Sequence, residues 1–239
     1  MWPFLRVLAV FTTAPVFSSR AVPARAKVAL AFFVALATQA SLPNMPVIGL
    51  NDPQVFGVII QQVGIGLAIG FTVRVVFAAV ELAGEVVGFQ MGLNFAAFFD
   101  PTLNAQTSAV ARFFGQMTSL LFVVLNGHLM VLVAINKSFQ SFPVDQNFLH
   151  SLGKMSLYRL GSDLFASALW IAFPMIGMLL FTNLALGIIS RVAPQMNIFS
   201  IGFPITLVVG LVGIAMTLPM LDQPFIALMG RAIEVFGGS

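Results

Sequence analysis

The sequence predicts an all-α integral membrane protein built from kinked helical hairpins. Of its 239 residues, 59% are hydrophobic and only 8% are charged, and the mean hydropathy is +1.01. A soluble domain carries about 25% charged residues, so these few charges cannot cover a surface that faces water. Long apolar runs, separated by short segments with proline and polar residues, match or exceed the roughly 20 residues of a membrane-spanning helix.

The first elements are a short apolar run and a helix after a basic loop. Residues 1–16 contain Arg6 and are shorter than the ~20 residues that a span needs. The loop that follows contains Arg20, Arg25 and Lys27, so the positive-inside rule predicts that it is cytoplasmic. Because no basic segment precedes the first apolar run, we expect that run to belong to the mature protein. Residues 27–42 predict the second helix, and residues 43–53, with three prolines, predict a loop on the other side.

The middle of the chain is a nearly unbroken apolar run over residues 55–99. As one helix it would be about 67 Å long, against a hydrocarbon core of about 30 Å. It therefore predicts either a hairpin that turns near residues 83–84 or a helix that is not a simple perpendicular span. A further apolar run follows over residues 108–135, and the positive-inside rule gives no consistent topology for either alternative.

The last third contains prolines inside its apolar runs. Residues 160–189 run through Pro174, and residues 205–221 are interrupted by Pro219. Because a proline inside a helix frees a carbonyl that neighbours must satisfy in lipid, we expect much of the chain to pack against other protein. Between these runs we predict a hinge at Pro194, Gln195, Asn197 and Pro204. No soluble-type repeat or linker is visible, so residues 1–239 are expected to form one domain.

Residues 81–114 concentrate the polar and small residues. On a straight helix, one face would carry Glu81, Glu85 and later Phe95 and Phe99, and glycines recur every four residues. Small residues let helix backbones approach closely, either within the chain or against other subunits. The two carboxylates must pair, protonate or face water, so a structural ion pair, a proton relay and an inter-subunit contact are all open. The residues assigned to helix packing or inter-subunit contact are Arg74, Glu81, Gly84, Glu85, Gly88 and Gly92.

An aromatic cluster precedes an Asp-Pro break in the same stretch. The residue before a proline disfavours helical geometry, so residues 100–106 are predicted to be non-helical. Such backbone between apolar runs is tolerated only inside protein or along a cavity. Apolar rings there are either ordinary core or a constriction that excludes water. The residues assigned to a pore seal or plug are Phe95, Phe98, Phe99, Asp100, Pro101, Thr102, Leu103 and Asn104.

Enzyme chemistry and nucleic-acid binding have little support in the sequence. The glycines at 64, 66 and 70 resemble a dinucleotide loop only loosely, because no strand precedes them. His128 and His150 stand alone, and the chain has no cysteine, so no metal site is predicted. The basic residues are scattered, which argues against nucleic acid. We expect no catalytic activity and no cofactor.

Four stretches together resemble the FliR family, the membrane component of the flagellar type III protein export gate. They read TAPVFSSRAVPARAKVAL, EVVGFQMGLNFAAFFDP, NGHLMVL and NLALGIISRVAPQMNIFSIGFPITL, at residues 13–30, 85–101, 126–132 and 183–207. The equivalent subunit of a virulence type III secretion system, the injectisome, is the nearest alternative. The sequence motifs AVPARAK, NGH and APQMNIF favour the flagellar family.

The resemblance implies one subunit of a helical assembly with FliP-like and FliQ-like proteins. Residues 1–135 would resemble the former and residues 136–239 the latter. The assembly would sit in the bacterial inner membrane at the flagellar basal body, with FlhB-like and FlhA-like partners and unfolded flagellar proteins as cargo. The loop matching about residues 95–111 looks like the plug of the closed channel. Family members usually carry a further stretch before the segment matching WPFLRV, so either the first helix is short or the protein begins upstream.

Two other classes remain open from the residues alone. A secondary transporter with broken helices would need interrupted helices in both halves around paired ionisable groups. Within its apolar runs the second half offers only Asp163, near the start of a run, and no pair comparable to Glu81 and Glu85, which counts against a transporter. A purely structural scaffold subunit is the third class.

Overall fold

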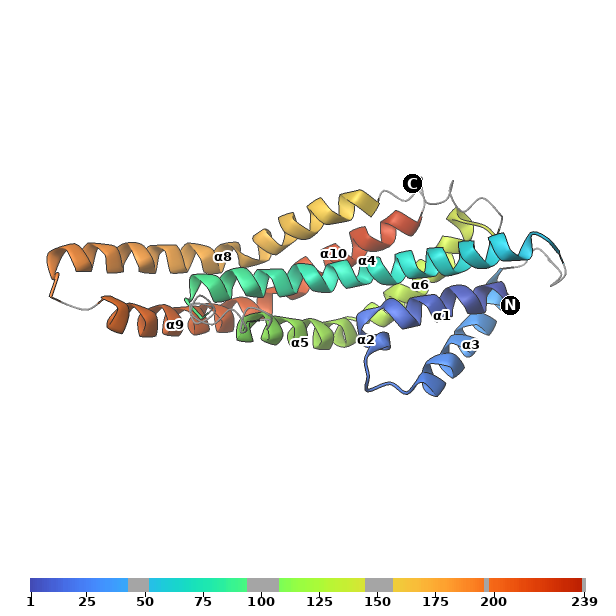
Figure 1. Ribbon diagram of the computed structural model, residues 1–239, viewed down its shortest axis with the longest axis horizontal. Helices are drawn as coiled ribbons and strands as arrows, with labels where there is room; N and C mark the ends of the chain where they lie inside the picture. The colour runs from blue at the N-terminus through green and yellow to red at the C-terminus, as the bar shows by residue number, and fades with distance from the viewer. Residues whose placement is uncertain (43–51, 94–107, 145–156, 196–197, 238–239) are drawn as a thin grey trace. The chain divides into compact units, whose positions relative to one another are not determined.

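The computed structural model describes residues 1–42, 52–93, 108–144, 157–195 and 198–237, and every regular element in these ranges is a helix (Figure 1). The α-helices are α1 (Trp2–Thr13), α2 (Pro15–Ser18), α3 (Ala24–Ser41), α4 (Val55–Gln90), α5 (Ala109–Val124), α6 (Gly127–Ser141), α8 (Leu157–Val192), α9 (Ile198–Thr217) and α10 (Asp222–Gly237). A short 3-10 helix, η3 (Leu218–Met220), contains Pro219.

The predicted class of all-helical membrane protein is confirmed. Within the described residues, three helices are long and apolar enough to cross a membrane: Val55–Gln90, Leu160–Val192 and Ile201–Met220. A fourth candidate is the pair formed by α5 and α6, which are bent by 69° at a short break. Asn126 stands at this break with φ 57°, a left-handed conformation that non-glycine residues other than Asn and Asp rarely adopt.

The central helix, α4, is continuous. The predicted hairpin near residues 83–84 is wrong, because Ala83 and Gly84 are buried inside this 36-residue helix. The other alternative is the one observed, since a helix of this length extends about 54 Å, well beyond the roughly 30 Å of a hydrocarbon core. In its most apolar stretch 61% of the residues are buried, against 28% in α8 and 33% in α9. Thus α4 lies among other helices, whereas α8 and α9 are mostly uncovered.

A glycine ends α4. Gly92 has φ +78°, and its N–H donates to the carbonyl of Phe89 at 3.0 Å. The N–H of Leu93 donates to the carbonyl of Gly88 at 3.1 Å. These two bonds form a Schellman motif, which satisfies the last helical carbonyls and requires a left-handed residue at Gly92. The predicted helix face therefore extends along α4 no further than Gly88.

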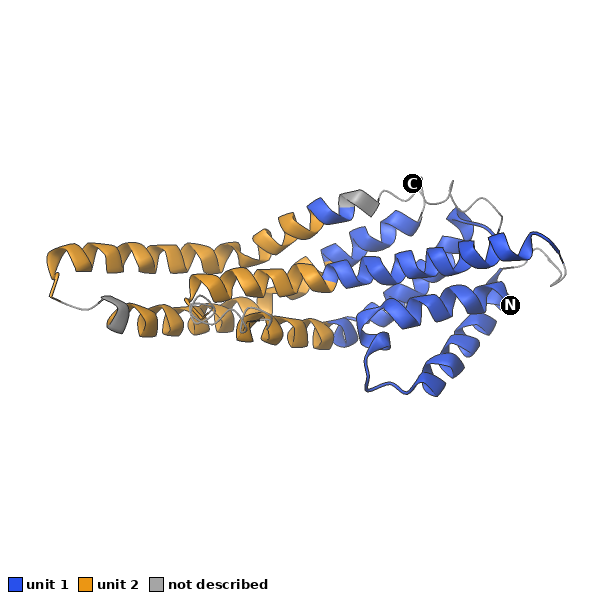
Figure 2. Ribbon diagram, viewed as in Figure 1, with its two compact units in different colours: residues 1–76, 122–162, 227–239 blue, residues 77–121, 163–226 orange. Residues whose placement is uncertain are grey.

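The chain divides into two compact units (Figure 2). Unit 1 comprises residues 1–76, 122–162 and 227–239, and unit 2 comprises residues 77–121 and 163–226. Each unit takes segments from both sides of residue 135, the predicted border between the FliP-like and FliQ-like portions. That two-part division stays a prediction.

Unit 1 is built around α1. A Cβ atom added at Gly66 of α4 would lie 2.7 Å from Cβ of Ala9, and one added at Gly70 would lie 2.6 Å from Cβ of Thr13. These two glycines therefore let α1 lie directly on the backbone of α4. On another side α1 packs against α3, where the rings of Phe4 and Phe32 meet edge to face at 6.5 Å.

Unit 2 joins the second half of α4 to α5, α8 and α9. The hydroxyl of Thr206 on α9 donates to the carbonyl of Met91, at the end of α4, at 3.3 Å. A Cβ atom at Gly210 would meet the side chain of Met91, and one at Gly213 would lie 2.6 Å from Cε of Met178 on α8. Flexible methionine side chains therefore fill the spaces that these two glycines leave on α9.

Candidate functional site

The predicted pore seal lies outside the described residues. Its members all fall within residues 94–107: Phe95, Phe98, Phe99, Asp100, Pro101, Thr102, Leu103 and Asn104. The structure does describe the two positions that flank this segment. They are the Schellman turn at Gly92 and the start of α5 after Ser108, both in unit 2.

The predicted glycine ladder lies against α5. A Cβ atom at Gly84 would lie 2.7 Å from the Cα of Ala111, and one at Gly88 would lie 3.1 Å from the hydroxyl oxygen of Ser108. We call this contact, formed by Gly84 and Gly88 with Ser108 and Ala111, the glycine interface. It brings two helix backbones into contact within the chain, as small residues permit. Gly92, the third member of the predicted ladder, ends the helix instead.

A carboxylate from α4 binds the start of α5. The N–H of Ser108 donates to Oε1 of Glu85 at 2.9 Å. The Ser108 hydroxyl in turn accepts the N–H of Ala111 at 3.1 Å, as an N-cap does. A negative charge is favourable at a helix N-terminus, where the backbone N–H groups lack partners within the helix. Glu85 therefore binds Ser108, the first described residue after the segment 94–107.

The second acid of the pair also lies over α5. A Cβ atom at Gly115 would be 2.7 Å from Oε1 of Glu81, so the missing side chain of Gly115 leaves room for this carboxylate. Glu81 is exposed, as is Arg74, which lies seven residues earlier on α4. The roles predicted for these residues in inter-subunit contact or proton transfer stay predictions.

The predicted hinge is spread over different structures. Pro194 and Gln195 lie in a turn that follows α8, whereas Pro204 lies inside α9. Asn197 lies outside the described residues. The chain thus turns after Val192, whereas Pro204 lies inside the helix α9.

Arg6, for which no role was predicted, is the centre of a buried polar cluster in unit 1. Its Nε donates to Oε1 of Gln62 at 2.9 Å, and its Nη1 donates to the hydroxyl of Ser138 at 2.9 Å. Its Nη2 donates to the carbonyl of Phe142 at 2.9 Å. The guanidinium also lies over the ring of Phe139, 3.7 Å from the centroid. We call this group the Arg6 cluster; it links α1, α4 and α6.

The three hydrogen-bond acceptors of this buried cation are neutral. Burial lowers the pKa of Arg6 to about 9, which leaves the guanidinium charged at neutral pH. Phe142 is the C-cap of α6, and a helix C-terminus carries partial negative charge that favours a cation. The cluster continues through Gln62, which donates to Gln61, and Gln61 donates to the carbonyl of Pro143 at 3.1 Å. A lone arginine in an apolar run is the signal that points to such a cluster.

Large apolar side chains are exposed on α8. Trp170 is 79% exposed, Phe173 is 70% exposed and Phe181 is 75% exposed. Several large exposed apolar side chains on one helix are typical of contact with lipid or with another protein. By contrast, the described part of the chain holds no group of three or more histidine, aspartate or glutamate side chains that could hold a metal ion.

Comparison with known proteins gives the same family as the four sequence stretches. The family model described as bacterial export proteins, family 1, matches residues 1–232. The flagellar biosynthetic protein FliR of Escherichia coli is 42% identical over 229 residues, which cover 94% of this chain and 85% of that protein. The protein of that name from Bacillus subtilis is 31% identical over 212 residues, covering 87% of this chain and 82% of its own length. This chain belongs to family 1 of the bacterial export proteins.

Proposed function

We propose that this chain is a non-enzymatic subunit of the flagellar type III protein export gate, in the bacterial inner membrane. The observation that carries the proposal is the match to flagellar FliR proteins along almost the whole chain. A shared local motif would not extend over 94% of the sequence. The apolar helices α4, α8 and α9 are consistent with a place in a membrane.

We further propose that the chain works inside an assembly with FliP-like and FliQ-like subunits and with FlhB-like and FlhA-like export proteins. Two features support this. The helix α4 is longer than a perpendicular span needs, and most of the apolar surface of α8 is uncovered in the isolated chain. Neighbouring subunits would cover such faces. They would also supply donors to the backbone carbonyls that Pro174 in α8 and Pro204 in α9 leave without a helical hydrogen bond.

Co-isolation tests the assembly. The chain is purified from its host membrane through an affinity tag, and the proteins that accompany it are identified by mass. A particle that contains several export polypeptides supports the proposal. A monodisperse particle of this polypeptide alone would favour a secondary transporter, and partners from a virulence secretion system would place the chain there.

The proposal that part of this chain closes the channel rests on the sequence and the family resemblance. Phe95 and Phe98 stand just before the Asp100-Pro101 break and are proposed to seal the channel for unfolded flagellar proteins. Replacing both with alanine should increase the leak of ions or small molecules in cells that express the whole gate. An unchanged leak in a gate that still assembles would count against the seal.

A further inference from the structure

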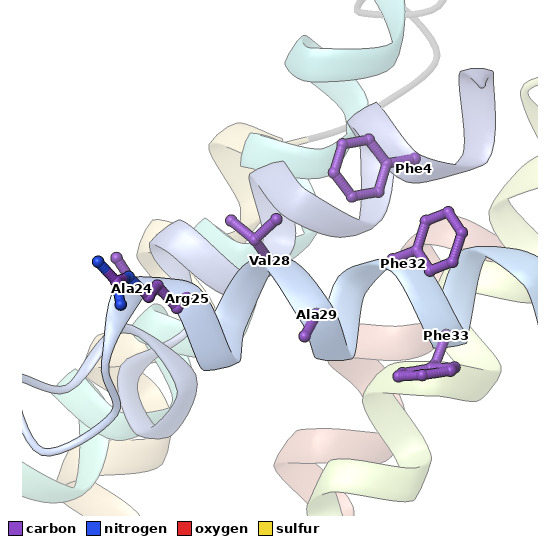
Figure 3. Close-up of a pocket in the computed structure, with 7 residues that line it drawn as sticks. All are labelled: Phe4, Ala24, Arg25, Val28, Ala29, Phe32 and Phe33. Carbon is purple, nitrogen blue, oxygen red and sulfur yellow. The ribbon is translucent and has the colours of Figure 1, made fainter.

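An apolar hollow lies on the surface of unit 1, between α1 and α3 (Figure 3). Its volume is about 650 Å³. The side chains that define it are Phe4, Arg25, Val28, Ala29, Phe32 and Phe33. Three of these apolar side chains are substantially exposed: Val28 by 46%, Phe32 by 52% and Phe33 by 67%.

A second hollow continues the first along α3. Its volume is about 310 Å³, it shares Phe4 and Phe32 with the first, and it reaches Leu36 and Gln39. From Arg25 to Gln39 the helix rises about 21 Å, which exceeds half of a hydrocarbon core of roughly 30 Å. We call the two hollows together the α1–α3 groove. Its length suits one extended hydrocarbon chain of a single membrane leaflet.

Charged side chains are confined to one end of the groove. Arg25 has the only charged side chain among the residues that line the two hollows, and it is exposed. From Val28 to Ser41 the sequence of α3 contains no charged residue. The nearby Lys27 lines neither hollow, and its ammonium donates to the carbonyl of Ser19 at 3.1 Å. The groove is therefore lined mainly by apolar side chains, with one cationic side chain at the Arg25 end.

We propose that the α1–α3 groove binds an anionic phospholipid, with an acyl chain along Phe4, Ala29 and Phe32 and the phosphate at Arg25. An anionic head joined to a hydrocarbon tail complements this distribution of charge. The volumes of both hollows lie in the range of about 300–1,000 Å³ that is typical of small-molecule sites. A guanidinium pairs well with phosphate oxygens. The basic loop is expected on the cytoplasmic side, where anionic lipids create a negative surface.

The absence of cysteine from the sequence gives a direct test. A single Ala29→Cys substitution in the full chain is labelled with a fluorophore, and the protein is placed in phosphatidylcholine vesicles. Brominated phosphatidylglycerol or brominated phosphatidylcholine is added at equal mole fraction, and quenching of the label is measured. A Leu129→Cys variant serves as the control, because Leu129 is an exposed residue of α6 in the same unit and lines neither hollow. We expect quenching at position 29 to favour the anionic lipid by about fivefold, and quenching at position 129 to show little preference.

Two charge variants separate a site from a general attraction to basic protein. Arg25→Gln should abolish the preference for the anionic lipid at position 29, whereas Arg20→Gln removes the same charge from outside the groove and should leave it unchanged. Equal loss in both variants would overturn the proposal, as would equal quenching by the two lipids. A label at position 29 that neither lipid quenches, while position 129 is quenched, would show that protein covers the groove.

Discussion

Two contacts between apolar helices, one in each unit, are built in different ways. In unit 1, the Arg6 cluster connects α1, α4 and α6 through three hydrogen bonds from one buried cation. In unit 2, the glycine interface connects α4 and α5 by close approach of backbones, with Glu85 bonded to the start of α5. The Arg6 cluster depends on long side chains that connect separate helices. The glycine interface depends on residues that have no side chain, so that the two backbones can approach.

This difference predicts which changes each of the two contacts tolerates. Loss of the cation in unit 1 leaves buried acceptors without a donor, which costs more than the average hydrogen bond contributes. Addition of a methyl group in unit 2 forces two backbones apart. The two contacts should therefore respond to opposite kinds of substitution, the Arg6 cluster to removal of a side chain and the glycine interface to addition of one.

The largest expected effect is that of Arg6→Ala. The substitution removes three hydrogen bonds and the contact with the Phe139 ring, and should lower the free energy of unfolding by about 3–5 kcal/mol. Thermal unfolding of the purified chain in mild detergent, followed by circular dichroism, measures the loss. Arg6→Lys should lie between Ala and the natural residue, because one ammonium cannot reach all three acceptors. Arg25→Ala, at an exposed position, is the control, and an equally small loss in Arg6→Ala would remove the distinction between the two contacts.

Next in size is Gly84→Ala in the glycine interface. The new Cβ would lie 2.7 Å from the Cα of Ala111, which is backbone and cannot rotate away, so a loss of about 1–3 kcal/mol is expected. Gly187→Ala is the matched control, since nothing lies within 4 Å of its added Cβ and alanine is the better helix former. The same unfolding measurement compares the two variants. Similar stability in both would show that α4 and α5 are not in close contact.

A smaller effect is expected for the carboxylate at the start of α5. Glu85→Ala removes the acceptor of the Ser108 N–H and should cost about 1–2 kcal/mol, whereas Glu85→Gln keeps an acceptor and should cost less. We also expect Ala at Glu81 or Glu85 to weaken co-isolation of partner subunits more than it changes the pH dependence of export. A variant that assembles normally but responds differently to pH would instead support a proton relay.

The smallest effect concerns the end of α4. Gly92→Ala places a side chain at φ +78° and should cost about 1 kcal/mol, although space is available there. Gly92→Asn should cost less, because asparagine tolerates the left-handed conformation. Unfolding midpoints of the two variants, compared with Gly177→Ala in the open part of α8, give the measurement. Equal midpoints for Ala and Asn at position 92 would argue against the Schellman motif.

The sequence predicted the fold class of this protein better than the contacts between its helices. Composition and long apolar runs are properties of whole segments, so the all-helical membrane fold and the positions of α3, α4 and α8 followed from them. The glycine interface was visible because small residues recur at helical spacing on one helix. The Arg6 cluster was not, because its acceptors lie 56, 132 and 136 residues away in the chain. A lone arginine in an apolar run indicates buried partners, but no local pattern shows which distant residues they are.

The predictions of local structure differed from the observed fold at single glycine and proline residues. The glycine at position 84 sits within a buried, continuous helix, whereas the glycine at position 92 ends it. Both appear as members of one periodic series in the sequence. Only the backbone conformation, left-handed at Gly92, distinguishes packing from termination. Proline gives a similar case, since Pro194 follows α8 in a turn and Pro204 lies within α9.

Export by living cells tests the central claim most directly. The gene for this chain is deleted in the bacterium that encodes it, and flagellar filament protein is measured in the medium and inside the cells. We predict that the protein disappears from the medium while its synthesis continues, and that the gene supplied in trans restores export. Export that continues unchanged without this chain would contradict its role as a gate subunit.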